Sequence, residues 1–483
     1  MRLVVTGGSM KIAVLPADGA ALLARDRVRS SVYLVMLSFA AIYFLIWPIW
    51  RAQFLIEIWP TEAWNAYLQD AAAGGQRLYP SPDSLVGNNY PPLSFYVVGY
   101  LGRIFGDNLF IGRALSLVSL AALGIEIFLA IRLLVADRTA AAVGALWYLA
   151  IMAHNSTTYV GANDPQIAGE AIMGAALVWF LARQGDRKSA LASLPPLLLM
   201  VVGGFWKHNL IGIPVTAIVW LFINHGRRAI GPALLSAAAA VAGLAACGAM
   251  FGPAFFSDLL ATRKYGFANV MTNVGHLQWS ALALAIWLAW ALSDRRSVAA
   301  RFTALHIGVG LCACVLQWFG DGVSGNAEFD FILALGIGVG VAFARIERLW
   351  FARTFGAAHA RDVMILALVM RLLVSERQET ALLVLSEPFR SSVAAHERDV
   401  IGDVAQVVDI PGDVSCTVKV VCRLAGKRFV HDEFKTEQLV ATGSATAADV
   451  AAMLNSRGIT PFVGQTSRSP PIDESIARWL AGR

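Results

Sequence analysis

The sequence predicts a polytopic all-α membrane protein with about eleven membrane-spanning helices, followed by a small soluble α/β domain. Three observations predict this architecture. Apolar residues make up 57% of the 483 residues and charged residues only 15%, whereas soluble domains average about 45–50% and about 25%. The apolar residues are concentrated in repeated runs of roughly 15–24 residues, the length that a helix needs to cross a bilayer. After residue 375 the pattern changes to short apolar runs between polar segments.

The first apolar run, 31–50, follows a mixed segment, 1–30, which ends in the basic cluster Arg25, Arg27 and Arg29. The run is long for the core of a signal peptide, and no small-residue cleavage site follows it. We therefore expect an uncleaved helix with the N-terminal segment in the cytoplasm. The further runs expected to cross the membrane are 110–131, 139–153, 165–182, 189–205, 209–224, 230–251, 278–293, 299–318, 329–344 and 362–375.

One shorter segment, Pro91–Phe105, is placed by the distribution of charge. If it does not cross, the short outer loops after the first one hold only Lys207, Arg263 and Lys264, and a much larger set of cations lies on the opposite side. Cytoplasmic loops carry the excess of positive charge. We therefore expect an interfacial helix at the outer surface and a C-terminus outside. The cytoplasmic cations are then Arg132, Arg138, Arg183, Arg187, Lys188, Arg227, Arg228, Arg295, Arg296, Arg301, Arg345, Arg348, Arg353 and Arg361.

These loops also account for the formal net charge of +6, which is therefore no evidence for binding of nucleic acid. The expected domains are a cytoplasmic segment, 1–30, a transmembrane domain, 31–375, and a soluble extracytoplasmic domain, 376–483. The transmembrane domain contains a large first outer loop, 51–110. No internal repeat and no phosphate-binding glycine motif stands out in the sequence.

The outer side of the predicted bundle collects the unusual polar residues. Ionisable side chains at or just inside helix ends are costly unless they are paired or face a wet cavity, so these residues form the candidate site. The candidate catalytic residues are Glu62 and Asp164. The candidate substrate-binding residues are Asn88, Asn89, Tyr90, Lys207, His208, Arg263, Lys264, Tyr265 and Asn326.

Several of these candidates also have a purely structural explanation. Lys207 and Arg263 can extend from a buried stem to the membrane interface. Asp164, directly before a proline, is a good helix N-cap. Glu62 can complement the dipole of a helix that begins beside it. These alternatives remain open at the level of sequence.

Two further candidates are ambiguous when taken alone. His208 can be a satisfied polar residue, and Tyr90 can belong to a rigid bend set by the two prolines that follow it. Together, however, the candidates place two carboxylates and several cations at one membrane surface. A carboxylate can take the proton of an acceptor hydroxyl, and cations can hold a phosphate leaving group and offset its growing charge. A phosphosugar on a lipid carrier requires both groups at the bilayer surface.

Short motifs follow one another in order along residues 31–345. They are Glu62-Ala63-Trp64-Asn65-Ala66-Tyr67, Leu78-Tyr79-Pro80, Asn88-Asn89-Tyr90-Pro91-Pro92-Leu93-Ser94-Phe95-Tyr96, Arg113-Ala114-Leu115-Ser116, Asn163-Asp164-Pro165, and Trp206-Lys207-His208-Asn209 with Pro214 behind it. Their order and spacing resemble the membrane-embedded GT-C glycosyltransferases, in particular the branch of the protein O-mannosyltransferases and the lipid A aminoarabinose transferase. The resemblance is carried chiefly by this order and spacing.

The resemblance implies inverting transfer of a hexosyl or pentosyl group from a polyprenyl-phosphate sugar, without a nucleotide sugar. The acceptor would be a glycan, a lipid or a protein at the outer face of the inner membrane. A divalent metal is left open, because metal dependence varies in the superfamily. One position departs from the family, which has Asp where this chain has Thr61. Either Glu62 serves as the base, or the site is altered or inactive.

The C-terminal segment predicts a mixed domain. Strand-like apolar runs at 381–385 and 418–422 alternate with helix-like segments such as 446–455. Outside the cytoplasm, Cys416 and Cys422 can form a disulfide; two free buried thiols are the alternative. A supporting or acceptor-binding role is expected for this domain.

Two other functions compete with glycosyl transfer. A transporter or flippase of a lipid-linked sugar would require charged residues buried within helices and inverted repeats, and the sequence indicates neither. A non-catalytic protein that binds a carrier lipid remains open because of Thr61.

Overall fold

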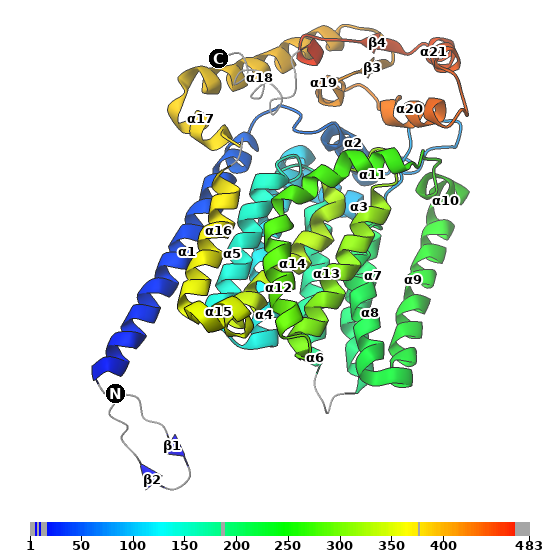
Figure 1. The fold of residues 1–483 in the computed structure, drawn as a ribbon. Coiled ribbons are helices and arrows are strands. Elements are labelled where there is room, and N and C mark those ends of the chain that lie inside the picture. The colour runs from blue at the N-terminus through cyan, green and yellow to red at the C-terminus, as the bar shows by residue number, and fades with distance from the viewer. Residues whose placement is uncertain (1–4, 7–8, 11–16, 185–188, 375–376, 469–483) are drawn as a thin grey trace.

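The structure is a computed structural model, and it describes residues 5–6, 9–10, 17–184, 189–374 and 377–468. A bundle of long helices forms the body of the molecule, and the C-terminal segment lies across one end of the bundle (Figure 1). The long helices are α1 (Ala17–Arg51), α4 (Asn108–Val135), α5 (Arg138–Asn155), α6 (Pro165–Arg183), α7 (Leu194–Trp206), α8 (Gly212–His225), α9 (Ile230–Phe251), α12 (Ala281–Ser293), α13 (Val298–Gln317), α14 (Phe329–Ala344) and α16 (Ala357–Leu373).

Each apolar run of the sequence therefore corresponds to one helix. By length and composition, six helical segments of the described chain can cross a membrane, or up to seven if the bent pair Phe267–Trp279 and Ala281–Ser293 is one span. Several of the remaining helices are shorter than the 17 or so residues that usually span a bilayer. The multi-pass architecture is thus supported, and the count of eleven crossings stays a prediction.

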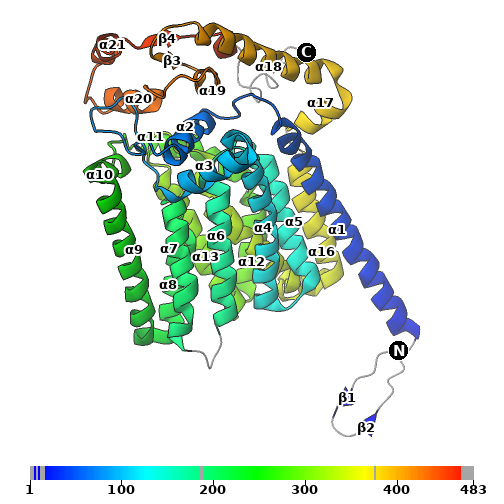
Figure 2. The same ribbon diagram turned by 180° about the vertical axis from the view of Figure 1, so that it is seen from behind.

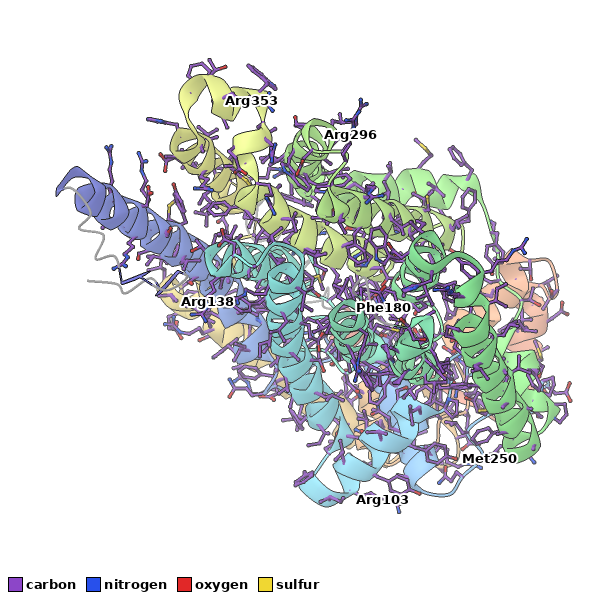
Figure 3. The ribbon with its side chains drawn as sticks, turned by 90° about the horizontal axis from the view of Figure 1, so that it is seen from below. Arg103, Arg138, Phe180, Met250, Arg296 and Arg353 are labelled. Atoms are coloured by element: carbon purple, nitrogen blue, oxygen red, sulfur yellow. A yellow bond between two sulfur atoms is a disulfide. The ribbon has the colours of Figure 1, made fainter. Side chains whose placement is uncertain are left out.

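Helix α14 forms the centre of the bundle, with almost every side chain buried, and it packs against α4, α5, α12 and α13. Small residues permit this close packing. A Cβ atom on Gly340 would lie only 2.4 Å from the side chain of Ile131 and 2.8 Å from the carbonyl of Ala140. Larger residues at this position would force α14 away from α4 and α5. Figure 3 views this bundle from the end opposite the C-terminal domain.

Shorter helices fill the two ends of the bundle. Near the C-terminal domain lie α2 (Thr61–Ala73) and α3 (Leu93–Phe105), which pack side by side (Figures 1 and 2). Helix α3 is an apolar helix of thirteen residues, and its placement at the membrane interface stays a prediction. The other short elements are α10 (Pro253–Leu259), α11 (Phe267–Asn273), α15 (Trp350–Phe355), η1 (Ala190–Ser193), η2 (Gly226–Ala229), η3 (Val274–Trp279), η4 (Gly325–Glu328), η5 (Ile346–Arg348), and the strands β1 (Val5–Thr6) and β2 (Ser9–Met10).

The C-terminal segment is mostly helical. It contains α17 (Glu379–Leu385), α18 (Glu387–Val408), β3 (Val414–Cys416), α19 (Lys419–Leu424), α20 (Glu433–Ala441), α21 (Ala447–Ser456), β4 (Thr460–Phe462) and η6 (Thr466–Arg468). Both runs predicted as strands are wrong, because 381–385 lies in α17 and 419–422 in α19, with Val418 as the N-cap of α19. An apolar run of five residues does not distinguish a strand from one buried turn of helix. The helix predicted at 446–455 is confirmed as α21.

Two observations tie this domain together and to the bundle. Cys416 and Cys422 form a disulfide, as expected. Arg423 on α19 donates hydrogen bonds to Asp70 at the end of α2 and to Asp107, the N-cap of α4, over 2.8 and 3.0 Å. The domain is therefore docked onto the C-terminal end of α2 and the N-terminal end of α4.

Candidate functional site

Helix α2 presents a polar face to the interior of the bundle. Glu62, Asn65 and Gln69 follow one another at helical spacing and are all at least 98% buried. The facing segment is the loop before α6. The Asn65 side chain donates to the carbonyl of Asn163 at 2.9 Å, and the amide groups of Gln69 and Asn163 exchange two hydrogen bonds. This network fixes α2 against the loop that carries Asp164.

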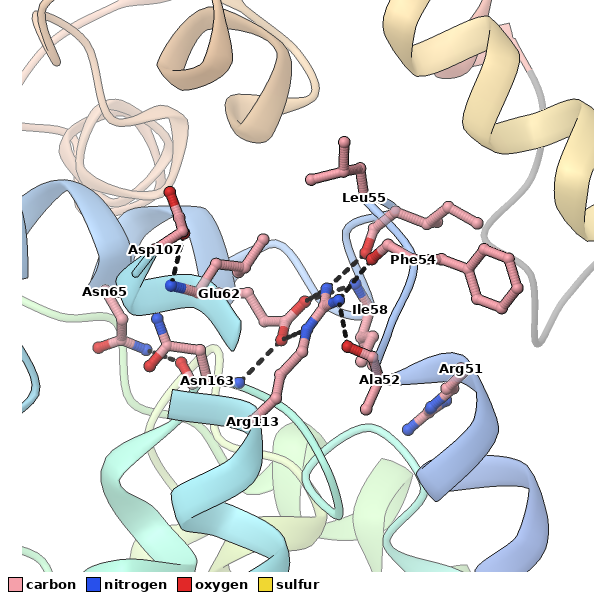
Figure 4. Close-up of polar contacts among 12 residues, drawn as sticks. Arg51, Ala52, Phe54, Leu55, Ile58, Glu62, Asn65, Asp107, Arg113 and Asn163 are labelled. Carbon is pink, nitrogen blue, oxygen red and sulfur yellow. Dashed lines mark hydrogen bonds and ion pairs between the residues drawn. The ribbon is translucent and has the colours of Figure 1, made fainter. Parts of the chain in front are cut away.

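Glu62 is saturated with hydrogen bonds (Figure 4). The Nε and Nη2 atoms of Arg113 donate to its two oxygens at 2.9 and 2.7 Å. The backbone N–H groups of Asn163 and Ile58 each donate to one oxygen at 2.8 Å. A carboxylate offers about four such acceptor positions. Glu62 is fully buried and all four are used, so the predicted role as general base stays a prediction that this geometry does not favour.

Arg113 organises the first outer loop through the rest of its guanidinium. Its Nη1 atom donates to the carbonyl of Phe54 at 2.6 Å, and its Nη2 atom donates to the carbonyl of Ile56 at 2.6 Å. The fixed, planar set of donors of a guanidinium can bond to a carboxylate and to several backbone carbonyls at the same time. Glu62 and Arg113 together hold the loop from α1 to α2 in one shape.

Asp164 and Lys207 form the second buried ion pair. Asp164 caps α6, since its side chain accepts from the N–H of Gln166 at 2.8 Å, and the same oxygen accepts from the Lys207 ammonium at 2.9 Å. Asp164 therefore both caps α6 and forms an ion pair with Lys207. Lys207 is 1% exposed and lies 4.4 Å from the centre of the Tyr90 ring.

The protonation states around this pair follow from its surroundings. Desolvation lowers the pKa of Lys207, but the Asp164 carboxylate and Tyr90 outweigh it and raise the pKa above its usual value. Lys207 is thus a charged group. Although His208 is exposed, partial desolvation of its ring, together with the cations Lys207 and Arg263, lowers its pKa below the usual value. His208 is therefore a neutral hydrogen-bonding group near pH 7, with its ring centre 6.2 Å from that of Tyr90.

The other predicted binding residues do not all join this group. Asn88 is buried and supports the bend, because its side chain bonds to the carbonyl of Leu78 and accepts from the N–H of Tyr90. Asn89 is half-buried, and its side chain makes no hydrogen bond to the described residues. Asn326 accepts from the N–H of Ser324 at 3.4 Å, within η4.

The loop after α10 is shared between the site and the C-terminal domain. The Arg263 guanidinium lies 5.5 Å from the ring centre of Phe434, on α20. The backbone N–H of Lys264 donates to the side chain of Gln438, also on α20. The side chains of Lys264 and Tyr265 are exposed. Of these three residues, only Arg263 acts on the Lys207 and His208 group.

Sequence reasoning missed one carboxylate in the first outer loop. Glu57 lies between two isoleucines, and its Oε1 atom is shielded from solvent with no hydrogen-bond partner. Desolvation raises the pKa of Glu57 to about 8, against the effect of nearby Lys419, which is on α19 of the C-terminal domain. The signal in the sequence was a single acid inside the apolar run Ile56-Glu57-Ile58.

Two more missed carboxylates lie inside the bundle. Glu170 on α6 and Asp330 on α14 are 1% and 3% exposed, and they contact each other. Asp330 accepts from the N–H of Gly212 at 2.7 Å, and Gln166 donates to Glu170 at 3.5 Å. The expectation that no charged residue is buried within a helix is therefore wrong.

A metal site was left open by the sequence. Within the part of the chain that the structure describes, no three His, Cys, Asp or Glu side chains come together in an arrangement suited to a metal ion.

Comparison with known proteins addresses the fold. No protein-family model and no curated protein sequence matches this chain. The crystal structure of ArnT from Cupriavidus metallidurans in the apo state matches with a TM-score of 0.55 and 15% identity, over 95% of both chains. ArnT bound to undecaprenyl phosphate matches with a TM-score of 0.51 and 16% identity, over 91% of both chains.

A further similar structure is the archaeal oligosaccharyltransferase AglB from Archaeoglobus fulgidus, in complex with an inhibitory peptide and a dolichol-phosphate. The TM-score is 0.47 at 11% identity, over 84% of this chain and 64% of AglB. The match to ArnT over almost the whole length establishes the fold. The chain therefore has an ArnT-like fold, which agrees with the helical membrane architecture expected from the motifs.

Proposed function

We propose that this protein is a glycosyltransferase that moves a sugar from a polyprenyl-phosphate carrier to an acceptor at the outer surface of the inner membrane. The observation that carries the proposal is the buried, charged Lys207. It lies at the end of the bundle nearest the C-terminal domain, with Asp164 and Tyr90 in contact and with His208 and Arg263 beside it. A buried cation of this kind suits a phosphate leaving group.

An apolar groove beside this group supports a lipid donor. The groove has a volume of about 390 Å³ and runs between α8 and α13. It reaches Ile211, four residues after Lys207, and Asn209 in the same loop bonds to Gln317 at the end of α13. An isoprenoid tail in this groove would leave its phosphate at the Lys207 end. The lining residues are Ile211, Val215, Ala304, Leu305, Gly308, Val309, Cys312, Ala313 and Leu316.

The proton acceptor in the proposed reaction is Glu57. The acceptor hydroxyl attacks the anomeric carbon, the bond from that carbon to the phosphate oxygen breaks, and the phosphate leaves on the carrier. The hydroxyl proton passes to the unpartnered oxygen of Glu57. A base with a pKa of about 8 is well matched to proton transfer near neutral pH. Glu62 and Asp164 then act as positioning residues, the first for the loop and the second for Lys207.

Two features support the proposed orientation. The excess of Lys and Arg lies in loops at the end of the bundle away from the C-terminal domain, as expected for cytoplasmic loops. The disulfide between Cys416 and Cys422 suits a domain in an oxidising compartment. The C-terminal domain would then share the outer surface with the candidate site, where Lys419 already faces Glu57.

The proposal is tested by transfer from labelled polyprenyl-phosphate sugars in membranes, with carrier binding measured in parallel. Lys207→Ala should weaken both carrier binding and transfer at least tenfold, because a charge-assisted contact contributes about 1.5–3 kcal/mol. Arg77→Ala is the matched control, since Arg77 is an exposed cation of the first outer loop, and it should leave both unchanged. Equal carrier binding by the Lys207→Ala and Arg77→Ala variants would refute the phosphate site.

The second candidate is a non-catalytic protein that binds a carrier lipid. It is favoured by Thr61, at the position where the family has its acid, and by the saturation of Glu62. Tight carrier binding without transfer from any of a broad panel of donors, in the wild-type protein and in Glu57→Gln alike, would establish this candidate.

A further inference from the structure

A second cavity lies at the end of the bundle opposite the candidate site. It has a volume of about 1070 Å³ and is surrounded by the ends of α4, α6 and α8 and the beginnings of α9 and α13. Figure 3 shows this end of the bundle, with Arg138 and Arg296 on it. The volume is slightly above the range of about 300–1,000 Å³ that is usual for small-molecule sites. Nothing in the proposed transfer reaction uses this cavity.

The lining divides into an apolar floor and a polar rim. Trp220 and Phe302 are 5% and 0% exposed and belong to the floor. The rim contains Arg228, His225 and Gln184, and no acidic side chain lines the cavity among the residues described. The full lining is Leu133, Leu134, Leu181, Gln184, Ser189, Ala190, Leu191, Trp220, Asn224, His225, Arg228, Gly231, Pro232, Val298 and Phe302.

Among the described residues that line the cavity, one side chain, Arg228, carries a formal charge at neutral pH. Arg228 is exposed and makes no ion pair or hydrogen bond with the described part of the chain. Three long helices end around the cavity and two begin there, so their dipoles partly offset one another. The amide nitrogen of Gln184 is already bonded to the carbonyl of Phe180 and the hydroxyl of Ser193. Arg228 is therefore the group available to an anion.

The cavity is also accessible from the bilayer side. Helix α9 forms part of its wall through Gly231 and Pro232. Only Pro232 and Ser236 of α9 are buried, and Figures 1 and 2 show this helix at the edge of the bundle. An amphiphile can therefore enter beside α9, with an apolar chain toward Trp220 and an anionic group toward Arg228.

We infer that this cavity binds an anionic glycerophospholipid of the cytoplasmic leaflet, with its phosphate at Arg228 and part of an acyl chain over Trp220 and Phe302. Basic pockets between transmembrane helices on the cytoplasmic side are known to take anionic lipid head groups. The inference is independent of the proposed transfer reaction, because it uses neither its residues nor its face of the membrane.

The test uses the purified full-length protein in detergent, with phosphatidylglycerol brominated in its acyl chains to quench tryptophan fluorescence. We expect a saturable quenching component that is lost in Trp220→Phe. Unbrominated phosphatidylglycerol should displace the probe, and phosphatidylcholine should do so much more weakly. Arg228→Gln should weaken binding about fivefold, because one basic residue near an anionic lipid contributes about 1 kcal/mol of binding free energy.

Two further variants make the test specific. Arg296→Gln removes an exposed charge at the same end of the bundle, outside the cavity, and should change nothing. Gly231→Leu fills the cavity without altering charge, since a Cβ at Gly231 meets no atom within 4 Å, and should reduce the quenching. Equal displacement by phosphatidylcholine, or a component that persists in Trp220→Phe, would overturn the inference. Displacement by inorganic phosphate at matched concentration would assign the site to free phosphate and also overturn it.

Discussion

A substitution at Glu62 tests whether this residue positions the first outer loop or accepts the proton in the reaction. Glutamine at this position keeps the shape but has one acceptor oxygen instead of two, and it turns an NH₂ group toward donors that all point at it. Arg113 would remain 1% exposed with its charge no longer compensated. Removing one partner of a buried ion pair costs about 3–5 kcal/mol. We therefore expect Glu62→Gln to lower the free energy of unfolding by an amount in this range.

The measurement is unfolding of the purified protein by denaturant, together with protease sensitivity of the loop between α1 and α2. Asp413→Asn is the control. Its partner Arg428 lies at 2.6 Å but is 79% exposed, so the change should cost less than about 1 kcal/mol. The double variant Glu62→Gln/Arg113→Gln should recover part of the loss, because no buried charge remains unpaired. If Glu62→Gln unfolds like the wild type and yet loses all transfer, the positioning role is refuted and Glu62 is the base.

Three other predictions concern the remaining groups. Asp164→Asn should keep the cap of α6, because Asn caps about as well as Asp, but should weaken carrier binding by removing the charge that holds Lys207; unchanged binding would contradict this. Transfer should fall as pH drops below about 8, the pKa to which burial raises Glu57, since only the carboxylate accepts a proton. Glu57→Gln should abolish this dependence and reduce the rate about 10²–10⁴-fold; a wild-type pH profile in that variant would exclude Glu57. Cys416 and Cys422 should resist alkylation in membranes until a reductant is added, and free reactivity would contradict the disulfide.

The parts of the fold that depend on local sequence could be predicted. Long apolar runs gave each long helix, because burial in hydrocarbon requires apolar side chains and internal hydrogen bonding over a fixed length. The N-cap at Asp164 could be predicted because it also depends on local sequence, namely that residue and the proline after it. The sequence also allowed the disulfide to be considered, because its two cysteines are only six residues apart.

The state of each carboxylate could not be predicted, because it depends on residues distant in the sequence. Glu62 is saturated by Arg113, 51 positions away, and by a backbone group 101 positions away. Glu170 and Asp330 lie on different helices, α6 and α14, and only the tertiary fold brings them into contact. The prediction of strands in the C-terminal domain was wrong because the apolar runs there are too short for their periodicity to distinguish a helix from a strand.

Helix α2 explains how the C-terminal domain can influence a site that it does not contain. Its faces are divided by the helical period: Glu62 points to the bundle, Tyr67 stacks on Phe429 of the C-terminal domain at 4.8 Å, and Trp64 packs edge-on against Tyr90 at 5.2 Å. Tyr90 in turn covers the cation that we assign to the phosphate. A helix of thirteen residues is rigid over this distance, because it has only about four turns. We therefore expect a displacement of the domain to move Glu62 and Tyr90 together, through the ring contacts that α2 makes with Phe429 and Tyr90.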